Sequence, residues 1–76
     1  MNDILSTTTV HKVNIQFIDK IIDSCDSHGK YEPLGLYYAY DEKADVYVGC
    51  DNSSRDAWVE EFVNESECIL WLMDCN

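Results

Sequence analysis

The pattern of apolar positions predicts two helices separated by a run of strands. Apolar residues recur at helical spacing over residues 15–27, which predicts an amphipathic helix. Asn14 stands where an N-cap is expected, and Gly29 stands where helices often end in a left-handed residue. The helix is rich in β-branched isoleucine, a weak helix former, so packing against the rest of the chain has to stabilise it.

Three segments rich in strand-forming residues follow, at residues 36–40, 45–50 and 57–62. The first two are joined by the polar turn 41–44, which predicts a hairpin. The loop 51–56 consists of residues that favour turns, so it is expected to lead into the third strand.

Alternation along each strand predicts which side chains share a face. The core faces of the hairpin are expected to comprise Leu36, Tyr38 and Tyr40 with Val46, Val48 and Cys50, which leaves Tyr37 and Tyr47 on the other face. The third strand has two orientations, and the larger apolar area of Trp58 and Phe62 favours burying these two rather than Ala57 and Val59.

The second helix has a clear start at Asn64, an expected N-cap, with Glu67 three residues later as in a capping box. Apolar residues cover most of its circumference beyond Cys68. This is more apolar surface than one sheet face needs. Either Trp71 packs over the sheet edge, or part of the helix contacts a partner or a second copy of the chain.

A chain of 76 residues forms one domain at most. The order of elements predicts an α+β fold in which a helix, a three-stranded antiparallel sheet and a second helix follow one another over residues 13–76. The polar segment 1–12 is expected to be a loosely ordered N-terminal extension.

Charge is the most unusual property of the sequence, whose formal net charge is −10. Residues 31–76 hold eleven of the fifteen acidic residues and only Lys43 and Arg55 as bases, so they carry a net charge of −9. Such a field repels nucleic acid and anionic membranes and attracts basic surfaces. The alternative is that the charge serves solubility alone.

Two groups of carboxylates are candidates for contact with a basic partner. One follows a stripe of the first helix, where residues four and three apart share a face. The other lies in the two loops between strands. The candidates are Asp19, Asp23 and Asp26 on the helix and Asp41, Glu42, Asp45, Asp51 and Asp56 in the loops.

The sequence lacks patterns typical of metal binding or catalysis. Its four cysteines show no C-x-x-C spacing, and its two histidines are isolated. No glycine-rich phosphate loop is present, and a chain this small has little room for a pocket with a supporting shell. We therefore expect no enzyme activity, no metal and no cofactor.

No run of about 20 apolar residues indicates a membrane span, and the N-terminus lacks the layout of a secretion signal. We therefore expect a cytoplasmic protein. In that compartment cysteines stay reduced and behave as small apolar core residues.

The segment 35–72 resembles small proteins carried by phages and mobile elements of Gram-positive bacteria. The resemblance is carried by the runs 45–49, 51–53, 57–62 and 67–72, which read DVYVG, DNS, AWVEEF and ECILWL. These are structural motifs, so the resemblance implies no site residues. In size and acidity the chain is also similar to anti-CRISPR proteins and other phage counter-defence inhibitors, several of which imitate DNA.

Two hypotheses for function follow. In the first, the protein is a non-enzymatic inhibitor whose acidic surface imitates nucleic acid and blocks a basic surface of a host nucleic-acid-binding or defence protein, such as a CRISPR nuclease. In the second, it is a hydrophobic interaction module or homodimeric adaptor that docks through its last helix. The anchors of the second are Tyr37, Tyr47, Trp71 and Met73.

Overall fold

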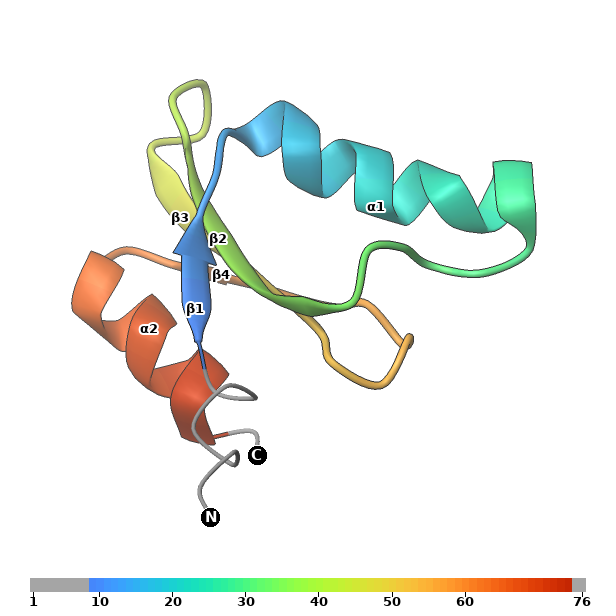
Figure 1. The fold of residues 1–76 in the computed structure, drawn as a ribbon. Coiled ribbons are helices and arrows are strands. Elements are labelled where there is room, and N and C mark those ends of the chain that lie inside the picture. Colours follow the sequence, from blue (N-terminus) through green and yellow to red (C-terminus); the bar gives the residue numbers. More distant parts are fainter. Residues whose placement is uncertain (1–8, 75–76) are drawn as a thin grey trace, which may run out of the picture.

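The computed structural model describes residues 9–74, apart from the side chains of residues 26–28 and 74. These residues form a small α+β domain with two helices and a four-stranded mixed sheet (Figure 1). In chain order the elements are β1 (Val10–Lys12), α1 (Ile15–His28), β2 (Gly35–Asp41), β3 (Val46–Asn52), β4 (Trp58–Phe62) and α2 (Glu65–Asp74).

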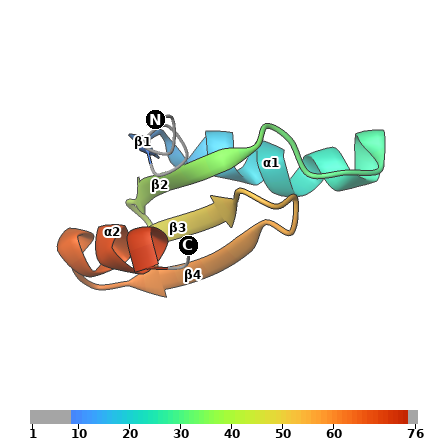
Figure 2. The ribbon, with the colours of Figure 1, turned by 60° about the horizontal axis from the view of Figure 1, so that its bottom comes forward.

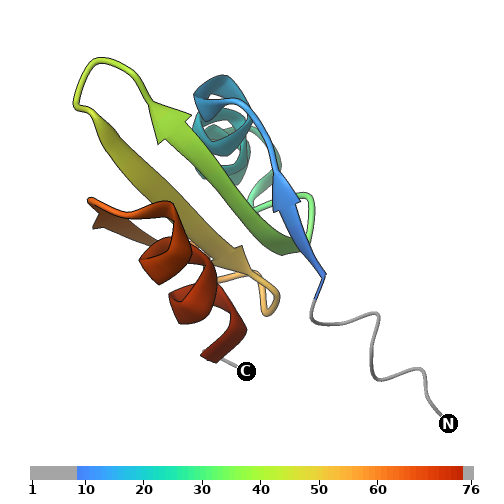
Figure 3. The same ribbon diagram turned by 90° about the vertical axis from the view of Figure 1, so that its left-hand side faces the viewer.

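The sheet has the strand order β1-β2-β3-β4, so each strand lies beside its neighbour in sequence (Figure 3). The pairs β2–β3 and β3–β4 are antiparallel, whereas β1 pairs with β2 in parallel. The prediction of a three-stranded antiparallel sheet is wrong in this detail. β1 is only three residues long, too short to give an alternating pattern, and α1 provides the crossover that a parallel pair requires.

Part of the predicted N-terminal segment 1–12 is therefore a strand of the sheet. Val10 lies opposite Leu36, and Lys12 lies opposite Tyr38. Residues 1–8 of that segment lie outside the described part of the chain.

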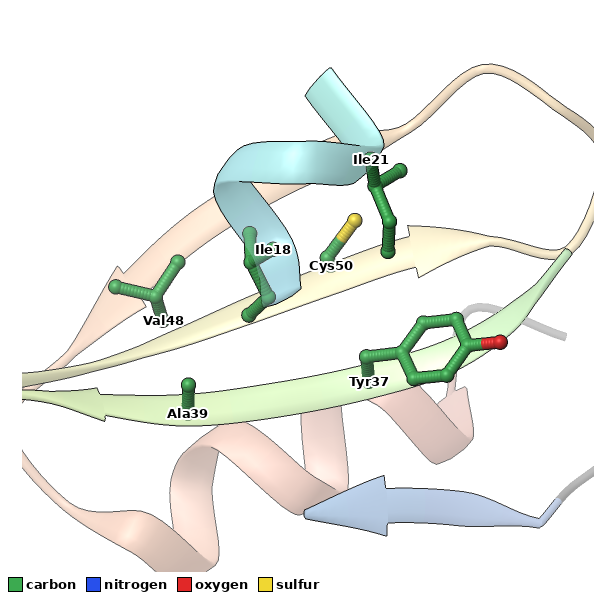
Figure 4. Packing of buried hydrophobic residues seen from close by; sticks show 6 residues of the cluster. All are labelled: Ile18, Ile21, Tyr37, Ala39, Val48 and Cys50. Atoms are coloured by element: carbon green, nitrogen blue, oxygen red, sulfur yellow. The ribbon is translucent and has the colours of Figure 1, made fainter. Parts of the chain in front are cut away.

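The two helices pack on opposite faces of the sheet (Figures 1 and 2). Ile18 and Ile21 of α1 pack on one face, where Figure 4 shows them above Tyr37, Ala39, Val48 and Cys50. Leu36 and Tyr38 point the other way, toward Cys68 and Leu72 of α2. The strand segments and their alternation are correctly predicted, but the assignment of a single core face is wrong because a helix packs on each face, and Tyr37 is accordingly buried. Val48 and Cys50 lie on the α1 face, opposite to Leu36 and Tyr38, because the register pairs Tyr38 with Gly49. Tyr40, which was expected in the core, is 39% exposed.

The ends of α1 agree with the sequence. The Asn14 side chain accepts a hydrogen bond of 2.9 Å from the backbone N–H of Phe17, as an N-cap does. Gly29 adopts the left-handed conformation at φ 77°, and its N–H donates to the carbonyl of Cys25.

α2 begins directly after Asn64 and is tied to the sheet at both ends of its apolar face. The Tyr38 hydroxyl donates a 2.7 Å hydrogen bond to the carboxylate of Glu65. Farther along, Trp71 contacts the Phe62 ring of β4, with ring centroids 5.6 Å apart. A Cβ at Gly49 would meet Trp71 ring carbons at 3.1 and 3.2 Å, so glycine allows α2 to lie close to β3.

β4 is an edge strand, and only one of its two aromatic residues packs inward. Phe62 is half-buried against Trp71, but Trp58 is 65% exposed. The prediction that Trp58 is buried is therefore wrong. Trp58 lies on the α2 face opposite Asp51, at the start of β4. α2 runs back along β4 after a short turn (Figure 2), and its Trp71 contacts Phe62 at the end of the strand.

Candidate functional site: an acidic groove beside α1

One helix on each face is too narrow to cover this sheet. At ~4.8 Å per strand, the axes of β1 and β4 are about 14 Å apart, and the sheet is wider still because the edge strands have width of their own. A helix with its side chains is only about 10 Å wide. α1 packs mainly against β2, and α2 packs against β3 and β4. On the α1 face, β4 is therefore left open, with Val59 and Glu61 exposed.

This open strip forms a groove of about 580 Å³ between α1, the β2–β3 turn and β4. Its lining comprises Asn14, Ile15, Gln16, Ile18, Asp19, Ile22, Tyr40, Asp41, Glu42, Lys43, Val48, Val59 and Glu61. The groove is thus built by segments that lie up to 47 positions apart in the sequence.

The lining of the groove combines exposed apolar side chains with acidic residues. Ile22 and Val59 are 41% and 39% exposed, so two branched apolar side chains from α1 and β4 remain in contact with solvent. The four acidic lining residues come from three elements: Asp19 from α1, Asp41 and Glu42 from the β2–β3 segment, and Glu61 from β4. Lys43 is the basic residue in the described lining.

The β2–β3 turn is held by its own aspartates. One carboxylate oxygen of Asp41 accepts hydrogen bonds of 3.1 and 3.4 Å from the backbone N–H groups of Lys43 and Ala44. The Tyr40 hydroxyl donates to the side chain of Asp45, and this hydrogen bond raises the pKa of Tyr40. These contacts fix the direction of the turn, so the carboxylate of Glu42 is presented on a defined backbone.

The structure brings together only some of the acidic residues that the sequence singled out. Asp19, Asp41 and Glu42 line the groove, while Asp23 and Asp45 are exposed outside its lining. The side chain of Asp26 lies outside the described residues.

Asp51 and Asp56 do not belong to the groove. Asp51 is 6% exposed, and its carboxylate accepts hydrogen bonds of 3.0 and 2.6 Å from the backbone N–H and hydroxyl of Ser53. It therefore shapes the β3–β4 loop instead of facing a partner. Asp56 is exposed in that same loop, at the end of β3 opposite to the β2–β3 turn.

Sequence reasoning missed Glu61. Glu60 and Glu61 are neighbours with opposite orientations, and which of them faces α1 depends on the register of β4. Opposite residues of an antiparallel pair share a face, so the pairing of Glu61 with Val48 and of Glu60 with Gly49 decides it. Correct assignment of the register of β4 against β3 would have identified Glu61.

The predicted apolar anchors are mostly part of the core. Tyr37 is 8% exposed, Tyr47 is half-buried beside Tyr40, and Trp71 is half-buried against Phe62. Met73 is 51% exposed and remains available. The other large apolar side chains exposed on β4, α2 and the turn between them are Trp58, Val59, Val63 and Leu70.

The thiols and the cavities offer little further chemistry. Cys50 and Cys68 are free and buried, and burial raises the pKa of each to about 11, with smaller contributions from Asp51 and Glu65 respectively. A second cavity of about 440 Å³ is lined by Lys20, Ser24, Glu32, Pro33, Leu34 and Arg55.

The described residues form neither a metal-binding cluster nor a membrane-spanning helix. Among the side chains that the structure describes, no group of three or more His, Cys, Asp or Glu is placed to hold a metal ion. Neither of the described helices has the length and apolar character needed to cross a membrane.

Comparisons of the chain with protein-family models, with curated proteins and with solved structures found no match.

Proposed function

We propose that this protein is a non-enzymatic inhibitor that binds a basic surface of a nucleic-acid-binding protein through the acidic groove. One observation carries the proposal: four acidic residues from three separate elements line a single groove, with Lys43 as its basic lining residue. Asp23 on α1 and Asp45 in the β2–β3 turn extend the negative surface beyond the lining.

The physical argument is electrostatic complementarity. Duplex DNA attracts proteins through a dense array of phosphates, and binding releases counterions, so affinity falls as salt rises. Carboxylates fixed on a folded scaffold present a comparable anionic surface without the cost of ordering a flexible chain. The size and acidity that the chain shares with counter-defence inhibitors support extending the proposal to a host defence protein such as a CRISPR nuclease.

The test is capture of nucleic-acid-binding proteins from a bacterial lysate on the immobilised full chain. The proposal predicts that such proteins are retained at low salt, eluted by salt and displaced by duplex DNA. Retention that is unchanged between 50 and 500 mM NaCl, or unaffected by DNA, would contradict nucleic-acid mimicry.

A second candidate function is docking through an apolar surface of β4 and α2. The observation that favours it is the exposure of Trp58, Leu70 and Met73, at 65%, 61% and 51%. Large exposed apolar side chains are typical of binding hot spots. If this surface mediates a homodimer, Leu70→Ser and Trp58→Ser shift the sedimentation coefficient from dimer to monomer, whereas a monomeric wild type removes the homodimer form.

A further inference from the structure

The groove resembles a binding site for one additional helix on the α1 face of the sheet. α1 covers β2 and also Val48 and Cys50 of β3, so the open strip lies over β4. Helices packed side by side have axes 8–10 Å apart, and the axes of β2 and β4 are about 10 Å apart at ~4.8 Å per strand. A helix lying along β4 would therefore pack beside α1.

The lining indicates what kind of helix would fit. Ile22 on α1 and Val59 on β4 are the exposed apolar side chains that a covering helix would bury. Asp19 lines the same groove from α1, Glu42 from the β2–β3 turn and Glu61 from β4. A complementary helix has an apolar stripe that contacts Ile22 and Val59, with Lys or Arg beside that stripe.

Charge argues against a second copy of this chain as the occupant. Its net charge is −10, and the exposed side of α1 carries Asp19 and Asp23. Placing that surface in a groove lined by Glu42 and Glu61 would bring like charges together. We propose that the groove binds a basic amphipathic helix of a partner protein. This inference rests on the proposed function and specifies the partner element.

Two probes of identical composition test the inference. One is a fluorescein-labelled 18-residue Leu/Lys peptide with leucines at helical spacing, and the other is the same peptide scrambled so that no apolar stripe forms. Binding to the full chain is measured by fluorescence anisotropy, and the contact surface is mapped from ¹⁵N chemical-shift changes. We expect the amphipathic peptide to bind at least tenfold more tightly and to shift the amides of Ile22, Val59 and Glu61.

A matched pair of variants provides the control. Ile22→Ser removes an apolar contact in the groove and is expected to weaken binding about tenfold. Leu34→Ser makes a similar change at an exposed position of the loop before β2, outside the groove lining, and is expected to change affinity less than twofold. Both side chains are substantially exposed, so both variants are expected to fold.

The outcomes separate this inference from the proposed function. Equal affinity for the two peptides, or shifts at Trp58 and Leu70 instead of the groove, overturns the helix-binding inference. Shifts confined to the outer edge of β4 would point to strand pairing and overturn it as well. If the chain still captures proteins from the lysate that duplex DNA displaces, the proposed function stands without the helix-binding inference. If that capture also fails, both the proposed function and the inference are wrong.

Discussion

Val48 and Glu61 lie directly opposite each other in the β3–β4 pair, on the face of the sheet that carries α1. Val48 is 7% exposed and belongs to the α1 core, whereas Glu61 is exposed and lines the groove. The boundary between core and groove therefore falls between two neighbouring strands. An antiparallel pair places an apolar side chain under the helix and a charged one just beyond it.

Gly49→Ala tests the close approach of α2 to the sheet. The new Cβ would lie 3.0 Å from the Cys68 sulfur and 3.1 Å from a Trp71 ring carbon, closer than normal packing allows. We expect a loss of about 1–3 kcal/mol in the free energy of unfolding, measured by urea denaturation. Combining Gly49→Ala with Trp71→Leu should recover part of this loss, because the smaller side chain relieves the clash. If the double variant instead loses the sum of the two single losses in the free energy of unfolding, the steric explanation is contradicted.

Asn52→Asp tests a buried polar link between two loops. The Asn52 side-chain amide donates a 2.8 Å hydrogen bond to the carbonyl of Pro33, and its oxygen accepts from the N–H of Ala57. Aspartate keeps the acceptor but lacks the donor, and it adds a charge at a position with 0% exposure. We expect a loss of at least about 2 kcal/mol in stability. An unchanged urea midpoint would show that the link to Pro33 is not formed.

Tyr38→Phe is expected to change the stability of the protein in a pH-dependent way. The hydrogen bond to Glu65, together with burial and neighbouring negative charge, raises the pKa of Tyr38 from 10.0 to about 12. The neutral hydroxyl is therefore favoured in the folded state. Its stabilising contribution is complete below pH 10 and is lost as pH rises from 10 to 12.

The urea stabilities of wild type and Tyr38→Phe should therefore differ at pH 8 and converge toward pH 12. The buried thiols of Cys50 and Cys68, each with a pKa of about 11, lower the stability of both proteins in parallel. A stability difference that stays constant from pH 8 to pH 12 would rule out the hydrogen bond as the cause.

The two tryptophans should differ in their access to solvent. Trp58 is 65% exposed, whereas Trp71 is half-buried against Phe62. We expect acrylamide to quench the fluorescence of Trp71→Phe, which retains Trp58, several times more strongly than that of Trp58→Phe. Similar quenching constants for the two variants would contradict the orientation of β4.

The elements with strong local signals could be predicted from the sequence. Asn14, Gly29 and the helical spacing between them fixed the bounds of α1 to within one residue. The polar turn between two alternating segments correctly indicated the β2–β3 hairpin. Local pattern could not reveal β1, because its three residues form a strand only by pairing with β2.

The faces of the sheet were harder to predict because they depend on where the helices pack. Alternation shows that Tyr37 and Tyr38 point in opposite directions, but not that both directions lead into a core. The same limit applies to the site. Asp19 was singled out by its place on the acidic stripe of α1 and Glu42 by its charge in the turn, while Glu61 joins them only through the register of β4.

The most direct test of the acidic groove compares Glu61→Lys with Glu60→Lys. The two variants carry the same charge change on neighbouring exposed residues, but only Glu61 lines the groove. Affinity is measured for a DNA-displaceable protein captured from the lysate, at 100 mM salt. We predict that Glu61→Lys weakens binding about tenfold or more while Glu60→Lys changes it less than threefold. Equal losses for both variants, or a larger loss for Glu60→Lys, would contradict a binding site in the groove.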